Sequence, residues 1–205
     1  MDTLYLTYLG IFLSFILCVS PFPNMIRRAK DNEMHYVPIH FLWVNHSTRM
    51  TWLCYGILKE IVPFITNCVM TGLASILMLI LYYFFTRSFA KFIALYVLFL
   101  TGLFGLSFWI LPVDWVGNLA ATLGTLTYIS TARNLRTALV TLNLKLIDLP
   151  ITCVALCNSL AWASYGLVIM DFPLIIGCSI GVIVSITLLV SYAWIRCSRL
   201  KKNND

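Results

Sequence analysis

Long apolar runs alternate with short polar connections along the whole chain, and the polar positions set the boundaries of the runs. A bilayer core is crossed by about 20 apolar residues in a helix, so each run predicts one membrane-spanning helix. The predicted helices cover about 4–21, 37–58, 61–85, 92–111, 115–132, 147–169 and 172–195. The pattern therefore predicts an all-α polytopic membrane protein with seven transmembrane helices.

One cluster of residues occurs twice within this pattern. Trp52-Leu-Cys-Tyr-Gly56 is echoed by Trp162-Ala-Ser-Tyr-Gly166, each near the end of one apolar run and just before the next. A proline and a cysteine follow both copies at the same distances, as Pro63, Cys68, Pro173 and Cys178. A recurring cluster inside hydrophobic segments indicates an internal duplication of a membrane unit.

The fourth run, at about 92–111, has no counterpart to the repeated cluster. We therefore expect a 3+1+3 plan, with two parallel three-helix bundles joined by a linker helix. A three-helix unit would be inverted when repeated directly, and one extra span restores the parallel orientation. The predicted parts are a first repeat (1–86), a linker helix (87–112), a second repeat (113–195) and a basic cytosolic tail (196–205).

Composition supports the membrane assignment and excludes several functions. The chain of 205 residues is 60% hydrophobic and 11% charged, whereas a soluble domain carries about 25% charged residues. Almost nothing remains for a catalytic domain in water, and no nucleophile–base pair or metal cluster is evident. We expect no enzyme activity, no cofactor and no metal. The seven cysteines lie in or beside apolar runs, so no disulfide framework is expected, and Cys153 and Cys157 are interpreted as buried small hydrophobes.

The net charge of +6 does not indicate a nucleic-acid partner, because the basic residues gather in alternate short connections. They are Arg27, Arg28, Lys30, Arg87, Lys91, Arg133, Arg136, Lys145, Arg196, Arg199, Lys201 and Lys202. The positive-inside rule then places the amino terminus outside and the carboxyl terminus in the cytosol. We expect a multi-pass protein of the plasma membrane, with the Golgi or another endomembrane as the alternative. The sequence leaves the oligomeric state open, a homo-oligomer included.

Motifs in both halves resemble one known family. The first half carries Ser20-Pro21, Arg27-Arg28, Pro38 and Trp52-x-x-Tyr55-Gly56-x-Leu58-Lys59. The second half carries Leu119-Ala-Ala-Thr122, Tyr128-x-Ser130, Arg136, Pro150, Trp162-x-x-Tyr165-Gly166 and Asp171. In order and spacing this set resembles the SWEET sugar uniporters of the MtN3/saliva family over nearly the whole chain. The resemblance implies a facilitative, bidirectional uniporter that moves mono- or disaccharides by alternating access.

The resemblance also implies two gates. The helix-bending prolines of the family correspond to Pro21, Pro38 and Pro150, and the fourth position is occupied by Thr131. These residues are expected to form hinges at the inner gate, because a proline frees a backbone carbonyl and lets a helix bend. The outer gate of the family corresponds to Tyr55, Gly56, Tyr165, Gly166 and Asp171.

A substrate pocket is implied near the middle of the membrane. Trp52 and Trp162 correspond to the stacking residues, since an indole face suits the C–H groups of a sugar ring. Asn67 corresponds to the asparagine of the third helix, whereas Cys178 stands where the seventh helix would carry its asparagine. Asn158, one turn before Trp162, is interpreted as a further pocket residue. A thiol is a weak hydrogen-bond partner, so this departure leaves the identity of the sugar open.

Two further features bear on mechanism. Arg49 lies inside a predicted span, and it either snorkels or contacts an aromatic ring, or it lines the solute path. No acidic residue lies deep in a predicted span, which favours facilitated diffusion over proton coupling. The alternatives are a proton-coupled small-solute carrier of the same helical plan and a seven-helix receptor. The internal repeat favours a transporter over a receptor.

Overall fold

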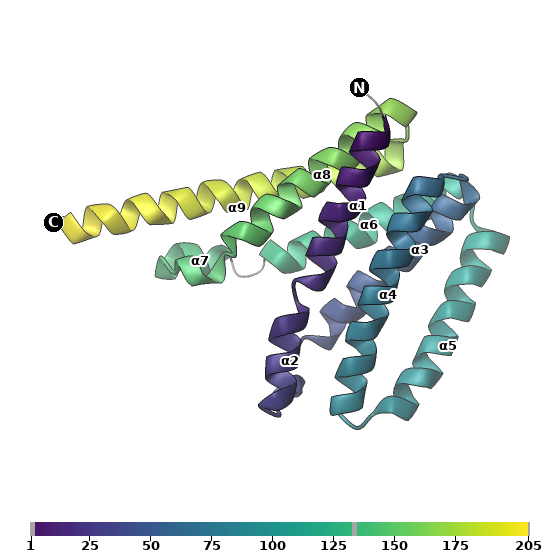
Figure 1. Ribbon diagram of the computed structural model, residues 1–205, viewed down its shortest axis with the longest axis horizontal. Helices are drawn as coiled ribbons and strands as arrows, with labels where there is room; N and C mark the ends of the chain where they lie inside the picture. Colours follow the sequence, from purple (N-terminus) through teal and green to yellow (C-terminus); the bar gives the residue numbers. More distant parts are fainter. Residues whose placement is uncertain (1–2, 133–134, 205) are drawn as a thin grey trace. The chain divides into compact units, whose positions relative to one another are not determined.

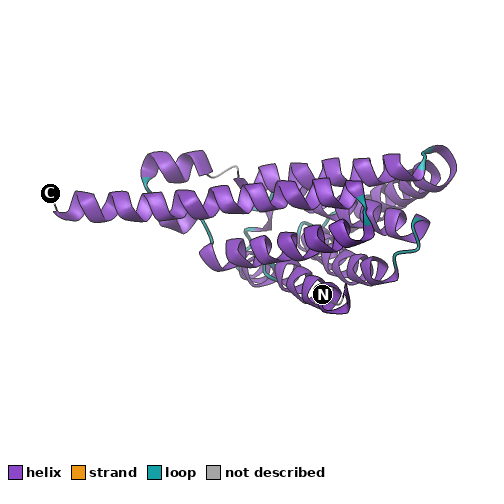
Figure 2. Cartoon of the chain, turned by 90° about the horizontal axis from the view of Figure 1, so that it is seen from above, coloured by secondary structure: helices purple, strands orange, loops and turns teal. Residues whose placement is uncertain are grey.

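The computed structural model describes residues 3–132 and 135–204, which fold into helices joined by short loops (Figures 1 and 2). In chain order the elements are α1 (Thr3–Val19), α2 (Phe22–Lys30), the 3₁₀ helix η1 (Met34–Tyr36), α3 (Ile39–Leu58), α4 (Val62–Phe85), α5 (Phe89–Gly105), the π-helical segment η2 (Leu106–Ile110), α6 (Val113–Ala132), α7 (Leu135–Thr141), the 3₁₀ helix η3 (Leu144–Leu146), α8 (Leu149–Ile169) and α9 (Phe172–Asn204). The prediction of an all-helical protein is confirmed for the described residues.

Five described segments are long and apolar enough to cross a membrane. They are Leu4–Lys30, Val62–Phe85, Ala90–Ile110, Leu149–Ile169 and Phe172–Arg199. The other two predicted spans correspond to α3 and α6, which have 20 residues each and are therefore about 30 Å long. Both are long enough to span a bilayer, but they carry more polar side chains, such as Asn45, His46 and Arg49 on α3.

Three segments predicted to be non-helical contain helix. Arg27, Arg28 and Lys30 lie in α2 rather than in a polar loop, Arg136 lies in α7, and α9 continues through the predicted tail to Asn204. Arginine and lysine have high helix propensity, so a polar run without proline or glycine does not end a helix. Arg133 lies outside the described residues.

The interpretation of Cys153 and Cys157 as buried residues is wrong. Both cysteines are exposed on the outer surface of α8. Their spacing of four residues places them on one helix face, and apolar neighbours in the sequence do not tell an outward face from an inward one. Lipid is as apolar as a protein core, so a membrane helix has no polar face to mark its outside.

The chain forms two compact units. The first unit is Ser14–Gly124, and the second consists of Thr125–Asp205 together with Met1–Leu13. In the first unit α3 and α4 pack against each other as a hairpin, and in the second α8 and α9 do the same (Figure 1). The unit boundaries fall within α1 and α6. The boundaries of the two repeats stay a prediction.

The turns that close the two hairpins have the same backbone geometry. Glu60 follows α3 with a φ of 56°, and Met170 follows α8 with a φ of 55°. In each turn the next residue donates its N–H back into the helix, from Ile61 to the Gly56 carbonyl at 3.0 Å and from Asp171 to the Gly166 carbonyl at 2.9 Å. This left-handed residue and backward hydrogen bond form a Schellman motif, which satisfies the carbonyls left free at a helix end.

The same correspondence occurs earlier in each half. Asn32 has a φ of 56° after α2, and Leu142 has a φ of 50° after α7. Asn32 and Leu142 are separated by 110 positions (142 minus 32), as are Glu60 and Met170 (170 minus 60). Each half therefore runs through a short helix, a 3₁₀ turn and two long helices in the same residue register.

Glycine at position 170 is expected to stabilise the protein. A residue with a Cβ pays roughly 1–2 kcal/mol in the left-handed region, and glycine does not. The Met170 side chain is 70% exposed, so little packing is lost on its removal. We expect Met170→Gly to raise the free energy of unfolding by about 1 kcal/mol in detergent. Met170→Ala keeps the Cβ and is the control; an equal gain from alanine would contradict the explanation.

Candidate functional site

Trp52 lies in the first unit, in the half of α3 that leads into the hairpin turn. Its indole is 8% exposed and meets the rings of Tyr55 and Phe64 edge-on, at centroid distances of 5.7 and 5.3 Å. A Cβ added at Gly124 of α6 would lie 4.0 Å from the indole nitrogen. Trp52 is therefore packed among α3, α4 and α6.

Trp162 has a similar environment in the second unit. Its indole is 3% exposed and meets Tyr165 edge-on at 5.7 Å. Its outer edge lies on α1 at Gly10, where an added Cβ would lie only 2.8 Å from Cε2. The absence of a side chain at Gly10 lets the indole lie directly on the backbone of α1. Because Trp52 and Trp162 belong to different units, their action on one sugar stays a prediction.

The residues predicted for the outer gate lie at the crossing points of the hairpins. A Cβ added at Gly56 would lie 3.3 Å from side chains of Phe64 and Ile65, and one at Gly166 would lie 3.3 Å from the backbone nitrogen of Ile175. Tyr55 and Tyr165 are buried next to these glycines. The glycines therefore let the helices of each hairpin approach closely. Whether this end of each hairpin opens as a gate stays a prediction.

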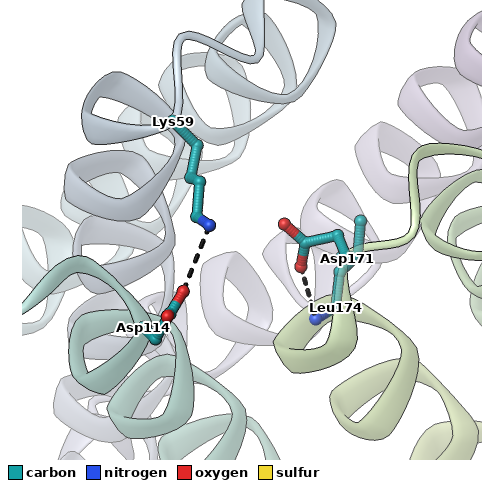
Figure 3. A network of polar contacts seen from close by, with 4 residues as sticks. All are labelled: Lys59, Asp114, Asp171 and Leu174. Carbon is teal, nitrogen blue, oxygen red and sulfur yellow. Dashed lines mark hydrogen bonds and ion pairs between the residues drawn. The ribbon is translucent and has the colours of Figure 1, made fainter.

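Asp171 has a structural role besides the predicted one at the outer gate. Its Oδ1 accepts a hydrogen bond from the backbone N–H of Leu174 at 3.0 Å, and the residue is buried (Figure 3). Asp171 thus caps the N-terminus of α9, where a carboxylate also suits the positive end of the helix dipole. An aspartate just before Phe172-Pro173 is a recognisable start signal of a helix, so the cap could have been predicted.

An ion pair of the first unit lies at the end of α3 that leads into the hairpin turn. Lys59 Nζ is 3.1 Å from Asp114 Oδ1 and joins the end of α3 to the first turn of α6 (Figure 3). The same nitrogen lies 5.9 Å from the ring centroid of Tyr55. The side chains of Lys59 and Asp114 are 39% and 73% exposed, so this pair contributes about 0–1 kcal/mol at most.

The predicted hinge residues occupy three different kinds of position. Pro21 lies between α1 and α2, and Ser20 Oγ donates to the Leu17 carbonyl at 2.9 Å. That carbonyl would receive the N–H that proline lacks, so the serine satisfies it at the junction. Pro38 and Pro150 stand at the starts of α3 and α8, where proline costs no helical hydrogen bond. Thr131 belongs to the last turn of α6. A hinge function for all four stays a prediction.

The polar residues predicted for the pocket are buried to different degrees. Asn67 on α4 is 4% exposed, and its Oδ1 has no hydrogen-bond partner among the described residues. Asn158 on α8 and Cys178 on α9 are half-buried, both in the second unit. Asn67 thus retains a hydrogen-bond acceptor that could receive a sugar hydroxyl.

A buried polar cluster links three helices of the first unit. His46 of α3 is 0% exposed; its Nδ1 lies 2.8 Å from Ser75 Oγ on α4, and its Nε2 lies 3.1 Å from the Tyr96 hydroxyl on α5. Ser75 donates its one hydroxyl proton to the Gly72 carbonyl at 2.8 Å, so Nδ1–H of His46 must be the donor to Ser75. In the neutral ring, Nε2 then accepts from Tyr96. The sequence alone does not reveal this cluster, because its members lie 29 and 50 positions apart in the chain.

Comparison with known proteins gives one informative result. No family model matches the sequence, and no curated protein matches it. Among solved structures, the chain is similar to a eukaryotic SWEET transporter, with a TM-score of 0.85 and 17% sequence identity over 95% of this chain and 97% of that chain. The chain shares the fold of a SWEET transporter. At this identity the similarity concerns the fold alone, and it supports the resemblance inferred from the repeated motifs at that level.

Proposed function

We propose that the chain is a facilitative sugar transporter that works by alternating access, as a bidirectional uniporter. The observation that carries this proposal is the fold similarity to a SWEET transporter over 95% of the chain. The duplicated Trp-x-x-Tyr-Gly cluster adds to it, because both tryptophans have the same kind of aromatic environment in their own units. This function requires no enzyme chemistry.

The proposal includes a layout and an orientation. The proposed layout is 3+1+3, with α1 and α2 counted as one broken span and α5 as the linker. The amino terminus is outside and the carboxyl terminus is in the cytosol of a multi-pass protein. Trp52, Trp162, Asn67, Asn158 and Cys178 contact the sugar. The gates are formed by the tyrosine–glycine pairs with Asp171 on the outside, and by the proline positions with Thr131 on the inside.

Transport is expected to be passive. The acidic residues of the described chain lie at helix ends or in turns: Asp31, Glu33, Glu60, Asp114, Asp148 and Asp171. A proton-driven carrier needs a carboxylate at depth that binds and releases a proton. In cells deficient in sugar uptake, radiolabelled glucose, fructose and sucrose should therefore enter only until the internal and external concentrations are equal.

The same assay tests the proposed function itself. Cells expressing the chain should take up at least one sugar faster than cells expressing no transporter, and should release it when preloaded. A protonophore should leave the uptake unchanged. Accumulation above the external concentration that a protonophore abolishes would instead show a proton-coupled carrier. A failure to carry any sugar in either direction, with the protein present at the cell surface, would overturn the proposal.

A further inference from the structure

Arg49 places a positive charge halfway along α3. The helix runs from Ile39 to Leu58, so Arg49 lies about 15 Å from either end. An arginine side chain is too short to cover that distance along the helix, which excludes snorkelling to the polar ends. The charge is therefore held at depth within the first unit, where an uncompensated charge is costly.

The side chain lies on the inward face of α3. Asn45 lies four residues before Arg49, Trp52 lies three residues after it, and Gly56 lies seven residues after it. The four residues therefore share one helix face. Asn45, Trp52 and Gly56 are buried, whereas Arg49 is half-buried. The accessible part of the guanidinium therefore does not lie on the outer face of the helix.

The first unit offers this charge no counter-ion among residues 14–124. Nε of Arg49 is buried with no hydrogen-bond partner there, and the ion pair in this unit joins Lys59 to Asp114. The described cation–π contact belongs to Lys59, which leaves the aromatic explanation of Arg49 without support in this unit.

A second unpartnered polar group lies at the same level of the hairpin. The helices α3 and α4 pack antiparallel, with Trp52 in contact with Phe64 and His46 in contact with Ser75. Arg49 lies midway between His46 and Trp52 on α3. It is therefore level with the turn of α4 that holds Asn67 and Cys68. Asn67 is 4% exposed, and its Oδ1 accepts no hydrogen bond among the described residues. Here a cation and a free acceptor lie within one region of one unit.

The guanidinium of Arg49 and the amide oxygen of Asn67 require different partners, the first a hydrogen-bond acceptor and the second a donor. A guanidinium binds an oxyanion through two parallel hydrogen bonds, and an amide oxygen accepts from a hydroxyl. A ligand that carries both an oxyanion and hydroxyl groups satisfies both. We propose that the solute is an anionic sugar, bearing a carboxylate or a phosphate, and that Arg49 selects it over neutral sugars. This selectivity rests on the transport function proposed above.

Glucose and glucuronate make a direct test, because they differ only in a carboxylate at C6. The full-length protein is reconstituted in liposomes clamped at zero membrane potential, and uptake of glucose, glucuronate and glucose 6-phosphate is compared. Wild-type protein should favour at least one anionic sugar over glucose. Arg49→Gln should lower this preference roughly ten- to hundredfold, the effect of losing hydrogen bonds to a charged group. The two anionic sugars separate a carboxylate ligand from a phosphate ligand.

Two further variants control for charge and folding. Arg49→Lys retains the cation and should keep part of the preference. Arg27→Gln removes a positive charge from the exposed face of α2, where Arg27 bonds Asn24 at 3.4 Å, and should leave the preference unchanged. If Arg49→Gln does not fold, the wild-type preference and Arg49→Lys still decide the result.

The outcomes for the function and for the anion selectivity are distinct. Wild-type uptake of glucose equal to or above that of both anionic sugars would overturn the selectivity while leaving sugar transport intact. If no sugar enters, the proposed function fails, and thermal stabilisation of the protein by glucuronate or glucose 6-phosphate at constant ionic strength then decides the selectivity. Stabilisation that Arg49→Gln abolishes would support the anion site. No stabilisation, or an equal effect in the variant, would overturn it.

Discussion

Alanine at Trp52 or Trp162 is expected to lower sugar uptake per folded molecule about ten- to hundredfold at concentrations below saturation. A large apolar side chain contributes roughly 1–3 kcal/mol when it is buried against a ligand, which corresponds to this loss of affinity. The two residues occupy equivalent positions in the two halves, each beside a tyrosine and a glycine. Similar losses in both variants are therefore expected. Initial rates of radiolabelled sugar uptake, divided by the amount of surface protein, measure the effect.

Normalisation to surface protein is essential, because the two indoles also pack within their units. Their low exposure means that alanine leaves a cavity, at a cost of about 3–5 kcal/mol in folding stability. Phenylalanine keeps a smaller ring and should retain more uptake than alanine at both positions. Normal uptake per molecule in Trp52→Ala and Trp162→Ala would show that the indoles serve packing alone.

Removal of the His46 side chain is expected to destabilise the first unit by about 3 kcal/mol. The substitution His46→Ala deletes two buried hydrogen bonds, each worth about 1 kcal/mol, and leaves a cavity where the ring was. The cluster joins α5 to α3, so the loss should also loosen α5 locally. Thermal unfolding in detergent and hydrogen exchange along α5 measure the two effects.

The variant Tyr96→Phe is the matched control for His46. It removes only the hydroxyl that His46 Nε2 contacts and keeps the ring that packs 5.4 Å from the imidazole. It should cost about 1 kcal/mol. Equal destabilisation by Tyr96→Phe and His46→Ala would mean that the bond to Ser75 and the packing of the imidazole contribute nothing.

The periodic features of the fold could be predicted from sequence because they are local. Apolar runs predicted the helices, and the repeated Trp-x-x-Tyr-Gly cluster pointed to turns that the structure places at matching positions after α3 and α8. Helix ends were less predictable where charged residues replaced apolar ones. Arg27, Arg28 and Lys30 continue a helix, because basic side chains lower the hydropathy of a segment without lowering its helix propensity.

The features that sequence did not predict depend on register between helices. His46, Ser75 and Tyr96 lie on three elements, and only the packing of those elements brings their polar atoms together. The contact of Trp162 with Gly10 joins residues from opposite ends of the chain. A single sequence gives the chemistry of each residue but not the long-range pairing. For the same reason, sequence indicated the unusual charge of Arg49 but not its lack of a counter-ion among the described residues of its unit.

The Schellman turns after α3 and α8 also determine the rotational phase of the helices that follow them. Each residue turns an α-helix by about 100°, so a single insertion between Lys59 and Ile61 would rotate α4 by more than a quarter turn about its axis. The buried face of α4, with Asn67 and Ser75, would then point away from α3. The two hairpins keep the same turn length 110 positions apart. These short connections therefore tolerate substitution at exposed positions such as Met170, but not a change in length.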